Sequence, residues 1–504
     1  MTVEQLLRAL RRLVAFDERG LSWGHPELQQ TCTGVTHDSR HVTAGTVFVA
    51  LRGLKMDGAV FAPQAIAAGA AVIVSESAAQ GTPDAAWITV PDARLALAYL
   101  AAEFNGHPSQ QMRVVGITGT NGKTTTAYLV SAILEAAGIK CGLMGTVLYR
   151  IGDQEFEATR TTPEAPEVQG FMKEMLTSGC RACVMEVSSH ALALRRVDGI
   201  RFAAGIFTNL TRDHLDFHTN MEDYFTAKRR LFEMLPDDAP AAINIDDPRG
   251  AALLDVVKRP VTYGLTKSAD VSPGSLSYSL EGLQFDVRSR RGPIRVRSRL
   301  VGRPNVYNIL AAIATTSALD VPTEAIEQGL ERLAGVPGRF EVASSPADDV
   351  TVVVDYAHTD DALRNLLETA RPLARRRLIT VFGAGGDRDK TKRPLMGMVA
   401  ARLSDIVVIT SDNPRSEDPN RIIEEVKRGA DAETRQSRAE VLTRPDRREA
   451  ILHAVGMADP GDVVLVAGKG HEKYQEIGGQ TFAFDDVEVA REALASRRLN
   501  SRAG

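Results

Sequence analysis

The sequence predicts an α/β protein of three domains built on parallel sheets. Short runs of consecutive apolar residues recur along the chain, with helical periodicity between them. In the last third the runs are 350–354, 378–382, 406–410 and 463–467, and each ends in a polar loop. Near-continuous apolar strands that alternate with helices are typical of a parallel sheet covered on both faces. A length of 504 residues agrees with two to four domains.

Two turn-rich segments divide the chain. Asn-Gly-His-Pro at 105–108 and Gly-Val-Pro-Gly at 335–338 predict domains of 1–107, 108–336 and 337–504. The first has strand-like runs at 46–51 and 71–74 among alanine-rich helical segments. The second opens with a strand at 112–117, a glycine-rich turn and an amphipathic helix that ends near Gly138, and strands recur at 183–187 and 205–208.

Composition excludes several classes of protein. With 44% hydrophobic and 25% charged residues, the chain is neither disordered nor collagen-like. A net charge of −4 argues against a nucleic-acid-binding or membrane-adhering surface. Four cysteines are too few for a disulfide framework, and the most apolar stretch, 65–74, is too short to cross a bilayer. We expect a cytoplasmic monomer that binds small molecules, with no nucleic-acid partner and no membrane insertion.

The strongest motif is GITGTNGKTTT at 116–126, between a predicted strand and a predicted helix. Backbone N–H groups of such a turn cradle phosphates, while Lys123 would reach the β- and γ-phosphates and Thr124 would offer its hydroxyl to Mg²⁺. Gly116 and Gly122 have five residues between them instead of the usual four, and the alternative is a plain glycine-rich turn. The expected nucleotide-binding residues are Gly119, Thr120, Asn121, Gly122, Lys123, Thr124 and Thr125. A P-loop alone does not name a reaction.

The variant TGTNGKT resembles the Mur ligase family, which also includes folylpolyglutamate synthetases. Further segments resemble this family in the same order: MEVSSH at 185–190, FTNLTRDHLDFH at 207–218, GRPNVYNILAA at 302–312, GVPGRFE at 335–341, DYAHTDDAL at 355–363, GAGGDRDKTKRPLMG from 383, DNPRSEDP from 412 and GKGHE at 468–472. The resemblance covers nearly the whole chain. Its last three segments look like those of members that add the third residue of the peptidoglycan stem peptide. Leu194 and Asp360 depart from the pattern, where relatives commonly have glutamine and proline.

The resemblance implies an N-terminal domain that holds a UDP-linked substrate, a central P-loop domain that binds ATP, and a Rossmann-like C-terminal domain that presents an amino acid. The implied reaction is amide formation. The γ-carboxylate of UDP-N-acetylmuramoyl-L-Ala-D-Glu attacks ATP, becomes an acyl phosphate and is then attacked by the amine of meso-diaminopimelate. Positioning and charge neutralisation are the protein's part in such chemistry.

Three residues gain roles from the resemblance. Glu186 and His214 would ligate Mg²⁺, and Lys228 would be carbamylated to N6-carboxylysine and bind a second Mg²⁺. By pattern alone they are a buried or capping glutamate, a loop histidine and a solvated lysine. Arg229 and Arg230 are either partners of the carbamate or surface residues. The expected catalytic set is Lys123, Glu186, His214 and Lys228, and the expected metal ligands are Thr124, Glu186, His214 and Lys228.

Other positions also match the family's motifs. Asn305 and Asn308, three apart on a predicted helix, would lie near the adenine, and Asp355 and His358 would contact the nucleotide where the last two domains meet. The residues that match UDP-substrate positions are Ser39, Thr161, Thr162, Ser188 and Arg196.

The third domain is expected to bind the amino acid at the carboxyl ends of its strands. Arg388 and Arg415 present planar forks suited to carboxylates, whereas Asp412 and Glu472 suit an ammonium group. meso-Diaminopimelate has a carboxylate at both ends and lysine does not, and DNPR resembles the diaminopimelate-adding subclass. A loop salt bridge at Arg415, or a dinucleotide-binding turn at GAGGDRD, is the alternative. The expected set is Arg388, Asp412, Asn413, Pro414, Arg415, Gly468 and Glu472.

Three rival functions stay open at this point. They are a lysine-adding Mur ligase, a folylpolyglutamate synthetase-like ligase and a nucleotide-controlled binding protein. Phosphate release assayed with each acceptor separates the ligases. A switch would hydrolyse nucleotide slowly and independently of any amino acid.

Overall fold

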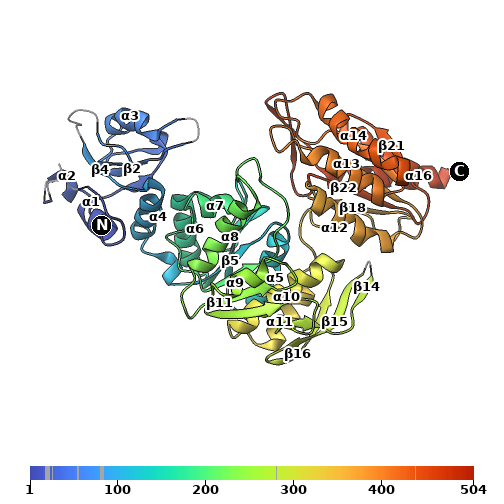
Figure 1. The fold of residues 1–504 in the computed structure, drawn as a ribbon, viewed down its shortest axis with the longest axis horizontal. Coiled ribbons are helices and arrows are strands. Elements are labelled where there is room, and N and C mark those ends of the chain that lie inside the picture. The colour runs from blue at the N-terminus through green and yellow to red at the C-terminus, as the bar shows by residue number, and fades with distance from the viewer. Residues whose placement is uncertain are drawn as a thin grey trace.

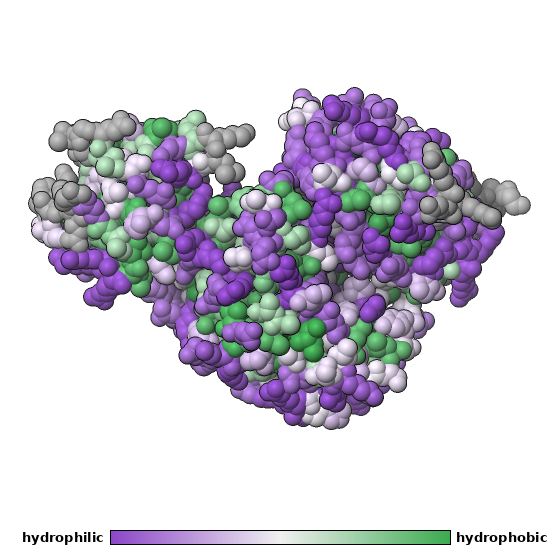
Figure 2. Space-filling view, in the orientation of Figure 1, coloured by the Kyte–Doolittle hydropathy of each residue, from purple (hydrophilic) through white to green (hydrophobic). Residues whose placement is uncertain are grey.

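The computed structural model describes residues 1–17, 23–24, 26–53, 56–79, 85–279, 281–437 and 439–503. They form three α/β domains, with the N-terminal and C-terminal domains on either side of the central one (Figure 1). The predicted fold class is confirmed. Figure 2 shows the surface hollowed between the two outer domains, above the central domain. No helix of the described residues is long and apolar enough to cross a membrane.

The N-terminal domain has a parallel sheet of order β1-β2-β3-β4. Its second strand is completely buried, as its run of apolar residues predicts. Helices α1 and α4 pack on one face, and α3 packs on the other. The bounds are α1 Val3–Arg11, α2 Pro26–Gln29, β1 Gly34–Thr36, η1 Ser39–His41, β2 Thr46–Ala50, η2 Gly58–Phe61, α3 Ala62–Ala67, β3 Val72–Ser75, β4 Ala86–Thr89 and α4 Ala93–Phe104.

The central domain has an eight-stranded sheet of order β12-β11-β10-β5-β9-β6-β7-β8. Strands β10, β5 and β9 are adjacent and parallel, so the segments that follow them meet at one edge of the sheet. The bounds are η3 Pro108–Gln110, β5 Arg113–Thr118, α5 Lys123–Ala136, β6 Cys141–Met144, β7 Leu148–Ile151, β8 Gln154–Glu157, α6 Ala165–Thr177, β9 Ala182–Glu186, α7 Ser189–Ala193, β10 Ala204–Phe207, α8 Met221–Glu233, β11 Pro240–Asn244, α9 Gly250–Leu254 and β12 Arg259–Tyr263.

A small antiparallel sheet and two helices complete this domain. The sheet contains the long hairpin of β15 and β16, whose residues alternate between buried and exposed. Its buried face packs in the same core as α5 and the helices α10 and α11. The bounds are β13 Ser272–Pro273, β14 Ser277–Ser279, β15 Gly282–Ser289, β16 Gly292–Ser298, α10 Arg303–Ala318 and α11 Thr323–Arg332.

The C-terminal domain has a six-stranded sheet of order β17-β18-β22-β19-β20-β21, parallel except for β17. Apolar cores cover both faces of this sheet. The bounds are β17 Glu341–Val342, β18 Thr351–Asp355, α12 Asp360–Ala370, η4 Arg371–Leu373, β19 Leu378–Phe382, α13 Lys392–Leu403, β20 Ile406–Ile409, α14 Pro419–Ser437, β21 Glu440–Thr443, α15 Arg447–Met457, β22 Val463–Ala467, β23 Tyr474–Ile477, β24 Gln480–Ala483 and α16 Asp486–Ala503.

Candidate active site

The loop between β5 and α5 can form only with glycines at two positions. Gly119 and Gly122 have φ of 149° and 85°. A Cβ at Gly119 would lie 1.8 Å from Thr208 Oγ1, and one at Gly122 would lie 2.3 Å from Asn308 Oδ1. No side chain caps the N-terminus of α5, so its N–H groups are open to an anion. Lys123 Nζ lies across the loop and donates to the carbonyls of Gly119 and Thr120 at 3.0 and 2.8 Å.

The segment after β10 supports this loop. Thr208 Oγ1 donates to the carbonyl oxygen of Asn121 at 2.7 Å, and Asn209 Oδ1 accepts from the backbone N–H of Asn121 at 2.9 Å. Thr120 N–H donates to the carbonyl of Asn209 at 2.9 Å. Thr124 and Thr125 are buried at the start of α5. The FTNLTRDH segment therefore holds the backbone conformation that a phosphate-binding loop requires.

Glu186 is buried at the end of β9, beside the phosphate-binding loop. Its Oε1 accepts from Thr146 N–H at 2.8 Å, and its Oε2 accepts from Thr146 Oγ1 at 3.0 Å. Burial lowers the pKa of Lys123, although the carboxylates of Glu186 and Asp213 oppose this effect. Glu186 is thus a buried anion close to the loop lysine, and Thr146, which the sequence did not single out, fixes its orientation.

His214 lies in the same region, in a left-handed conformation with φ of 54°. Its Nε2 is 3.3 Å from Asp213 Oδ2, and its ring is 4.9 Å from that of His190. Burial lowers the pKa of His214 to about 3, so the imidazole is neutral at physiological pH. Among the described residues, no three His, Cys, Asp or Glu side chains are grouped closely enough to hold a metal ion.

Lys228 is almost completely buried in α8, and not a solvated residue as the pattern alone suggests. Its Nζ donates to the carbonyl of Gly119 at 2.8 Å and lies 4.4 Å from the ring centre of Tyr224. Burial, reinforced by the Lys123 ammonium, lowers its pKa well below the usual value. Arg229 and Arg230 point elsewhere, to Glu233 at 2.9 Å and Asp198 at 2.7 Å, so neither steadies a group on Lys228.

Arg339 is a residue that the sequence analysis missed. Its Nη2 donates to Thr124 Oγ1 at 3.0 Å, and its guanidinium carbon lies 4.6 Å from the ring centre of Tyr356. It therefore joins the start of α5 to the segment after β18. Arg339 lies within the segment GVPGRFE, between the predicted second and third domains, and this position is the feature of the sequence that could have indicated its role.

The nucleotide residues expected outside the loop are all buried or half-buried nearby. Asn308 touches the loop through Gly122 and Thr126, and its Nδ2 donates to Asn305 Oδ1 at 2.9 Å. His358 Nδ1 lies 2.9 Å from the carbonyl oxygen of Tyr356, and burial lowers its pKa to about 4. Burial raises the pKa of Asp355, which accepts from Phe340 N–H at 2.7 Å.

Four of the five residues expected for the UDP-linked substrate form one hydrogen-bonded group. Thr162 Oγ1 donates to the carbonyl of Glu186 at 2.8 Å and accepts from Ser188 N–H at 3.1 Å. Arg196 Nη1 donates to the carbonyl of Thr162 at 3.0 Å, and Thr161 Oγ1 lies 3.1 Å from Thr146 Oγ1. Ser39, in the N-terminal domain, instead donates to Gln64 Oε1 at 3.1 Å.

The expected amino-acid residues come together on three loops of the C-terminal domain. Gly386 N–H donates to the carbonyl of Asn413 at 2.9 Å, and Asn413 Nδ2 donates to Glu472 Oε2 at 2.9 Å. A Cβ at Gly468 would lie 2.4 Å from Asp412 Oδ2, and one at Gly386 would lie 1.9 Å from the carbonyl oxygen of Pro414. Arg388 is exposed on the first of these loops.

One carboxylate oxygen of this group is unsatisfied. Asp412 is buried, its Oδ1 accepts from Asn413 N–H at 2.7 Å, and its Oδ2 has no hydrogen-bond partner within the described part of the chain. Burial acts to raise the pKa of Asp412, but the cations of Arg447 and Lys469 leave it below its usual value. An anionic, buried oxygen without a donor is suited to a ligand ammonium group.

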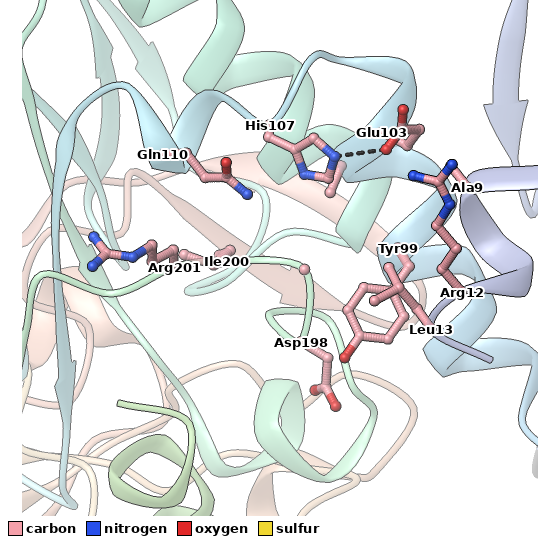
Figure 3. Close-up of a pocket in the computed structure, with 12 residues that line it drawn as sticks. Ala9, Arg12, Leu13, Tyr99, Glu103, His107, Gln110, Asp198, Ile200 and Arg201 are labelled. Carbon is pink, nitrogen blue, oxygen red and sulfur yellow. Dashed lines mark hydrogen bonds and ion pairs between the residues drawn. The ribbon is translucent and has the colours of Figure 1, made fainter. Parts of the chain in front are cut away.

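A cavity of about 400 Å³ has a lining that includes Asp198, the partner of Arg230 (Figure 3). It is between α1, α4 and the segment 198–201, where the N-terminal and central domains meet. Its lining includes Arg12, Tyr99 and Arg201, and His107 Nε2 lies 2.7 Å from Glu103 Oε2 at its edge. None of the predicted site residues lines it.

This combination of fold and loop is found in a known family. Three models of protein families match this chain. They are the Mur ligase family catalytic domain at residues 31–105, the Mur ligase middle domain at 117–316, and the Mur ligase glutamate ligase domain at 338–470. The chain belongs to the Mur ligase family and is an ATP-dependent ligase.

Individual relatives and solved structures are similar to nearly the whole chain. The chain is 46% identical to a protein of Syntrophomonas wolfei over 93% of this chain and 96% of that one, and 48% identical to a protein of Solibacter usitatus over 93% and 95%. Both are named UDP-N-acetylmuramoyl-L-alanyl-D-glutamate–2,6-diaminopimelate ligase. A solved structure of that name aligns with a TM-score of 0.68 at 33% identity, over 96% of this chain and 100% of that one. The MurF ligase of Thermotoga maritima in complex with ADP shares the fold, at 19% identity and a TM-score of 0.61, over 94% and 99% of the two chains.

Proposed function

We propose that this chain adds meso-diaminopimelate to the D-Glu γ-carboxyl group of UDP-N-acetylmuramoyl-L-Ala-D-Glu, with conversion of ATP to ADP and phosphate. This reaction is a step of peptidoglycan precursor synthesis and takes place in the cytoplasm. The enzyme acts as a monomer. The names of the relatives support the substrates.

The observation that carries the proposal is the charge pattern of the C-terminal loops. Arg388 and Arg415 lie on loops that are bonded to each other, since Asp387 Oδ1 accepts from Ser416 Oγ at 2.8 Å. Asp412, on the same loop as Arg415, has an Oδ2 that accepts no hydrogen bond within the described residues and lies 3.8 Å from Arg447 Nη1. Two guanidinium groups and an unsatisfied carboxylate suit an amino acid with two carboxylates and an ammonium group. Lysine would leave one guanidinium without an anion.

The chemistry needs positive charge and exclusion of water. An oxygen of the D-Glu γ-carboxylate attacks the γ-phosphorus, the bond to the β-phosphate oxygen breaks, and ADP leaves. The amine of diaminopimelate then attacks the acyl carbon, loses a proton, and expels phosphate. Lys123, which donates to the carbonyl of Gly119, and Arg339, which donates to Thr124 Oγ1, would neutralise the triphosphate and the transferred phosphoryl group.

The donor set near the loop suits Mg²⁺. Thr124, Glu186 and His214 offer oxygen and imidazole ligands, and Mg²⁺ would offset charge on the phosphates. Lys228 as an ammonium cannot ligate a cation, but as a carbamate it would offer two anionic oxygens. CO₂ reacts with a neutral amine, and the buried site of Lys228, beside the Lys123 ammonium, favours the neutral form. We therefore assign Lys228 as the carbamylated residue and a ligand of the second ion.

Carbamylation is testable without an activity assay. Protein equilibrated with ¹³C-bicarbonate should give one carbamate carbon signal by NMR, absent from Lys228→Arg. Lys140→Arg, which changes a partly exposed lysine paired with Asp153, is the matched control and should retain the signal. A signal that persists in Lys228→Arg would contradict the assignment.

Product formation tests the main proposal. Purified protein with ATP, Mg²⁺ and UDP-N-acetylmuramoyl-L-Ala-D-Glu should release phosphate and form the tripeptide product with meso-diaminopimelate, and far less with lysine. Faster turnover with lysine would instead identify a lysine-adding ligase. Turnover only with a folate and glutamate would identify a folylpolyglutamate synthetase-like enzyme.

A further inference from the structure

Arg195 has a backbone conformation that favours glycine. Helix α7 ends at Ala193, Leu194 is its C-cap, and Arg195 follows with φ of 58°. Arg196 N–H donates to the carbonyl of Ala191 at 2.9 Å, which is the hydrogen bond of a Schellman motif. Glycine is usual at the left-handed position of this motif because a Cβ is unfavourable there. An arginine at this position therefore points to a role of its side chain.

The side chain of Arg195 joins two domains. Its Nε lies 2.5 Å from Asp92 Oδ2, and its Nη1 donates to Asp198 Oδ1 at 2.9 Å. Asp92 is the N-cap of helix α4 in the N-terminal domain, where its Oδ1 accepts from Leu95 N–H at 2.9 Å. Asp198 is only 7% exposed and also accepts from Arg230 Nη2 at 2.7 Å. Asp198 thus holds Arg195 from the central domain, and Arg195 holds the start of α4.

The second half of α4 contacts the central domain by packing. A Cβ at Gly199 would lie 2.6 Å from the carbonyl oxygen of Ala98, and Lys173 Nζ lies 5.9 Å from the ring centre of Phe104. The cavity of Figure 3 lies beside these contacts, so the junction is incompletely filled there. Loss of the ion pair at the start of α4 would therefore leave the N-terminal domain free to rotate about the remaining contacts.

The residues assigned to the UDP-linked substrate lie on both sides of this junction. Ser39 is in the N-terminal domain, whereas Thr162, Ser188 and Arg196 are in the central domain. Arg196 directly follows Arg195 and pairs with Glu164 at 2.8 Å, beside Thr162. One ligand that reaches both sets binds best when the orientation of the two domains is already fixed, because binding then does not have to order them.

We propose that Arg195 is a positioning residue for the UDP-linked substrate, which fixes the N-terminal domain in the orientation that lets one ligand reach both sets of residues. This inference rests on the proposed function. Arg195 acts through Asp92 and touches neither the substrate nor the reacting atoms. Its loss should therefore weaken substrate binding and leave kcat at saturating substrate nearly unchanged.

Calorimetry with two ligands tests the proposal. Arg195→Gly should raise the Kd of UDP-N-acetylmuramoyl-L-Ala-D-Glu by about tenfold, the effect of losing one hydrogen bond between charged groups. The Kd of UDP, which we assign to the N-terminal domain alone, should change little. Glycine suits the φ of this position, so urea denaturation should show little loss of stability. Arg195→Lys, which retains the charge, should restore part of the substrate affinity.

A second variant tests the ion pair itself. Asp92→Asn keeps a side chain that caps α4 but removes its charge, so it should weaken substrate binding as Arg195→Gly does. The double variant should bind no more weakly than either single variant, because both changes remove the same interaction. Additive losses would overturn the assignment of the effect to this pair.

Asp320→Gly is the matched control. Asp320 follows the C-cap of α10 with φ of 65°, Val321 N–H donates to the carbonyl of Thr316 at 3.0 Å, and the exposed carboxylate pairs with Arg291. The change therefore also replaces a charged residue by glycine in a Schellman motif, but away from the domain junction. It should leave the Kd of both ligands unchanged, and a tenfold loss here would overturn the inference.

Domain orientation can be measured without any ligand. Ala67 on α3 and Ala251 on α9 are exposed, and the four native cysteines are buried, so Ala67→Cys and Ala251→Cys allow selective spin labelling. Pulsed electron paramagnetic resonance should give a broader distance distribution in Arg195→Gly than with Arg195 present. An unchanged distribution, or an equal loss of affinity for UDP and for the full substrate, would overturn the inference. Failure of the wild type to bind the UDP-linked substrate would contradict the proposed function, whereas the distance distribution tests Arg195 in either case.

Discussion

Replacement of Arg415 by alanine removes one of the two guanidinium groups that we assign to the carboxylates of the amino acid. Truncation of one partner of a desolvated charge pair costs about 2–5 kcal/mol. Arg415 is 25% exposed and already paired with Glu476, so the lower value applies. About 2 kcal/mol corresponds to a rise of about 30-fold in KM for diaminopimelate. KM for ATP and for the UDP-linked substrate should change little.

Folding should be affected much less than binding. Glu476 is 36% exposed, so without Arg415 it is hydrated, and the lost surface ion pair is worth about 0–1 kcal/mol. Steady-state kinetics with each substrate varied in turn, together with urea denaturation, separates the two effects. Arg421→Ala is the control, since Arg421 is 72% exposed and lies 3.6 Å from Glu425. An unchanged KM for diaminopimelate in Arg415→Ala would refute the assignment.

Three further predictions concern other parts of the chain. Gly119→Ala should abolish ATP binding measured by calorimetry, because the new Cβ would lie 1.8 Å from Thr208 Oγ1; normal affinity would contradict the assigned loop. Arg447→Ala should lower the free energy of unfolding by about 3–5 kcal/mol, because it leaves a fully buried carboxylate unpaired. Arg448→Ala, which breaks an exposed pair, should cost at most about 1 kcal/mol, and similar losses in both would be inconsistent with this reasoning. Burial lowers the pKa of His471 to about 3 from about 6.5, so the unfolded chain binds more protons between these values. The stability that neutral His471 contributes is therefore complete above pH of about 6.5 and is lost as pH falls towards 3, so urea titrations should show His471→Asn losing less stability on acidification than wild type.

Much of the fold could be predicted because buried parallel strands are recognisable by composition. The run at 378–382 coincides with β19, and the run at 112–117 is one residue from β5. The sheet of β13–β16 was not predicted, although Leu283, Phe285 and Val287 alternate with polar residues as half-buried strands do. Half-buried strands with alternating apolar and polar residues are missed when strands are predicted only from continuous apolar runs.

The site could be predicted only in part. The proposed phosphate-binding loop is a local motif, and its glycines and Lys123 were singled out because a strand, glycines, Lys-Thr and a helix follow one another, although the spacing is not the usual one. Lys228 resembles a surface lysine in a helix rich in charged residues, and only the packing of α8 against Gly119 buries it. Arg339 and Thr146 were overlooked because their partners, Thr124 and Glu186, are distant in the sequence.

The sequence by itself determined the loop that we propose binds phosphate, since the groups assigned to it are backbone N–H groups of successive residues and a lysine beside them. Tertiary structure alone decided which ionisable side chains are buried and which charges meet. Lys228 reaches a carbonyl 109 positions away, and Glu476 meets an arginine on a separate loop. Proton affinity and charge pairing depend on the dielectric surroundings and on neighbours in space, and neither is encoded by the spacing of residues along the chain.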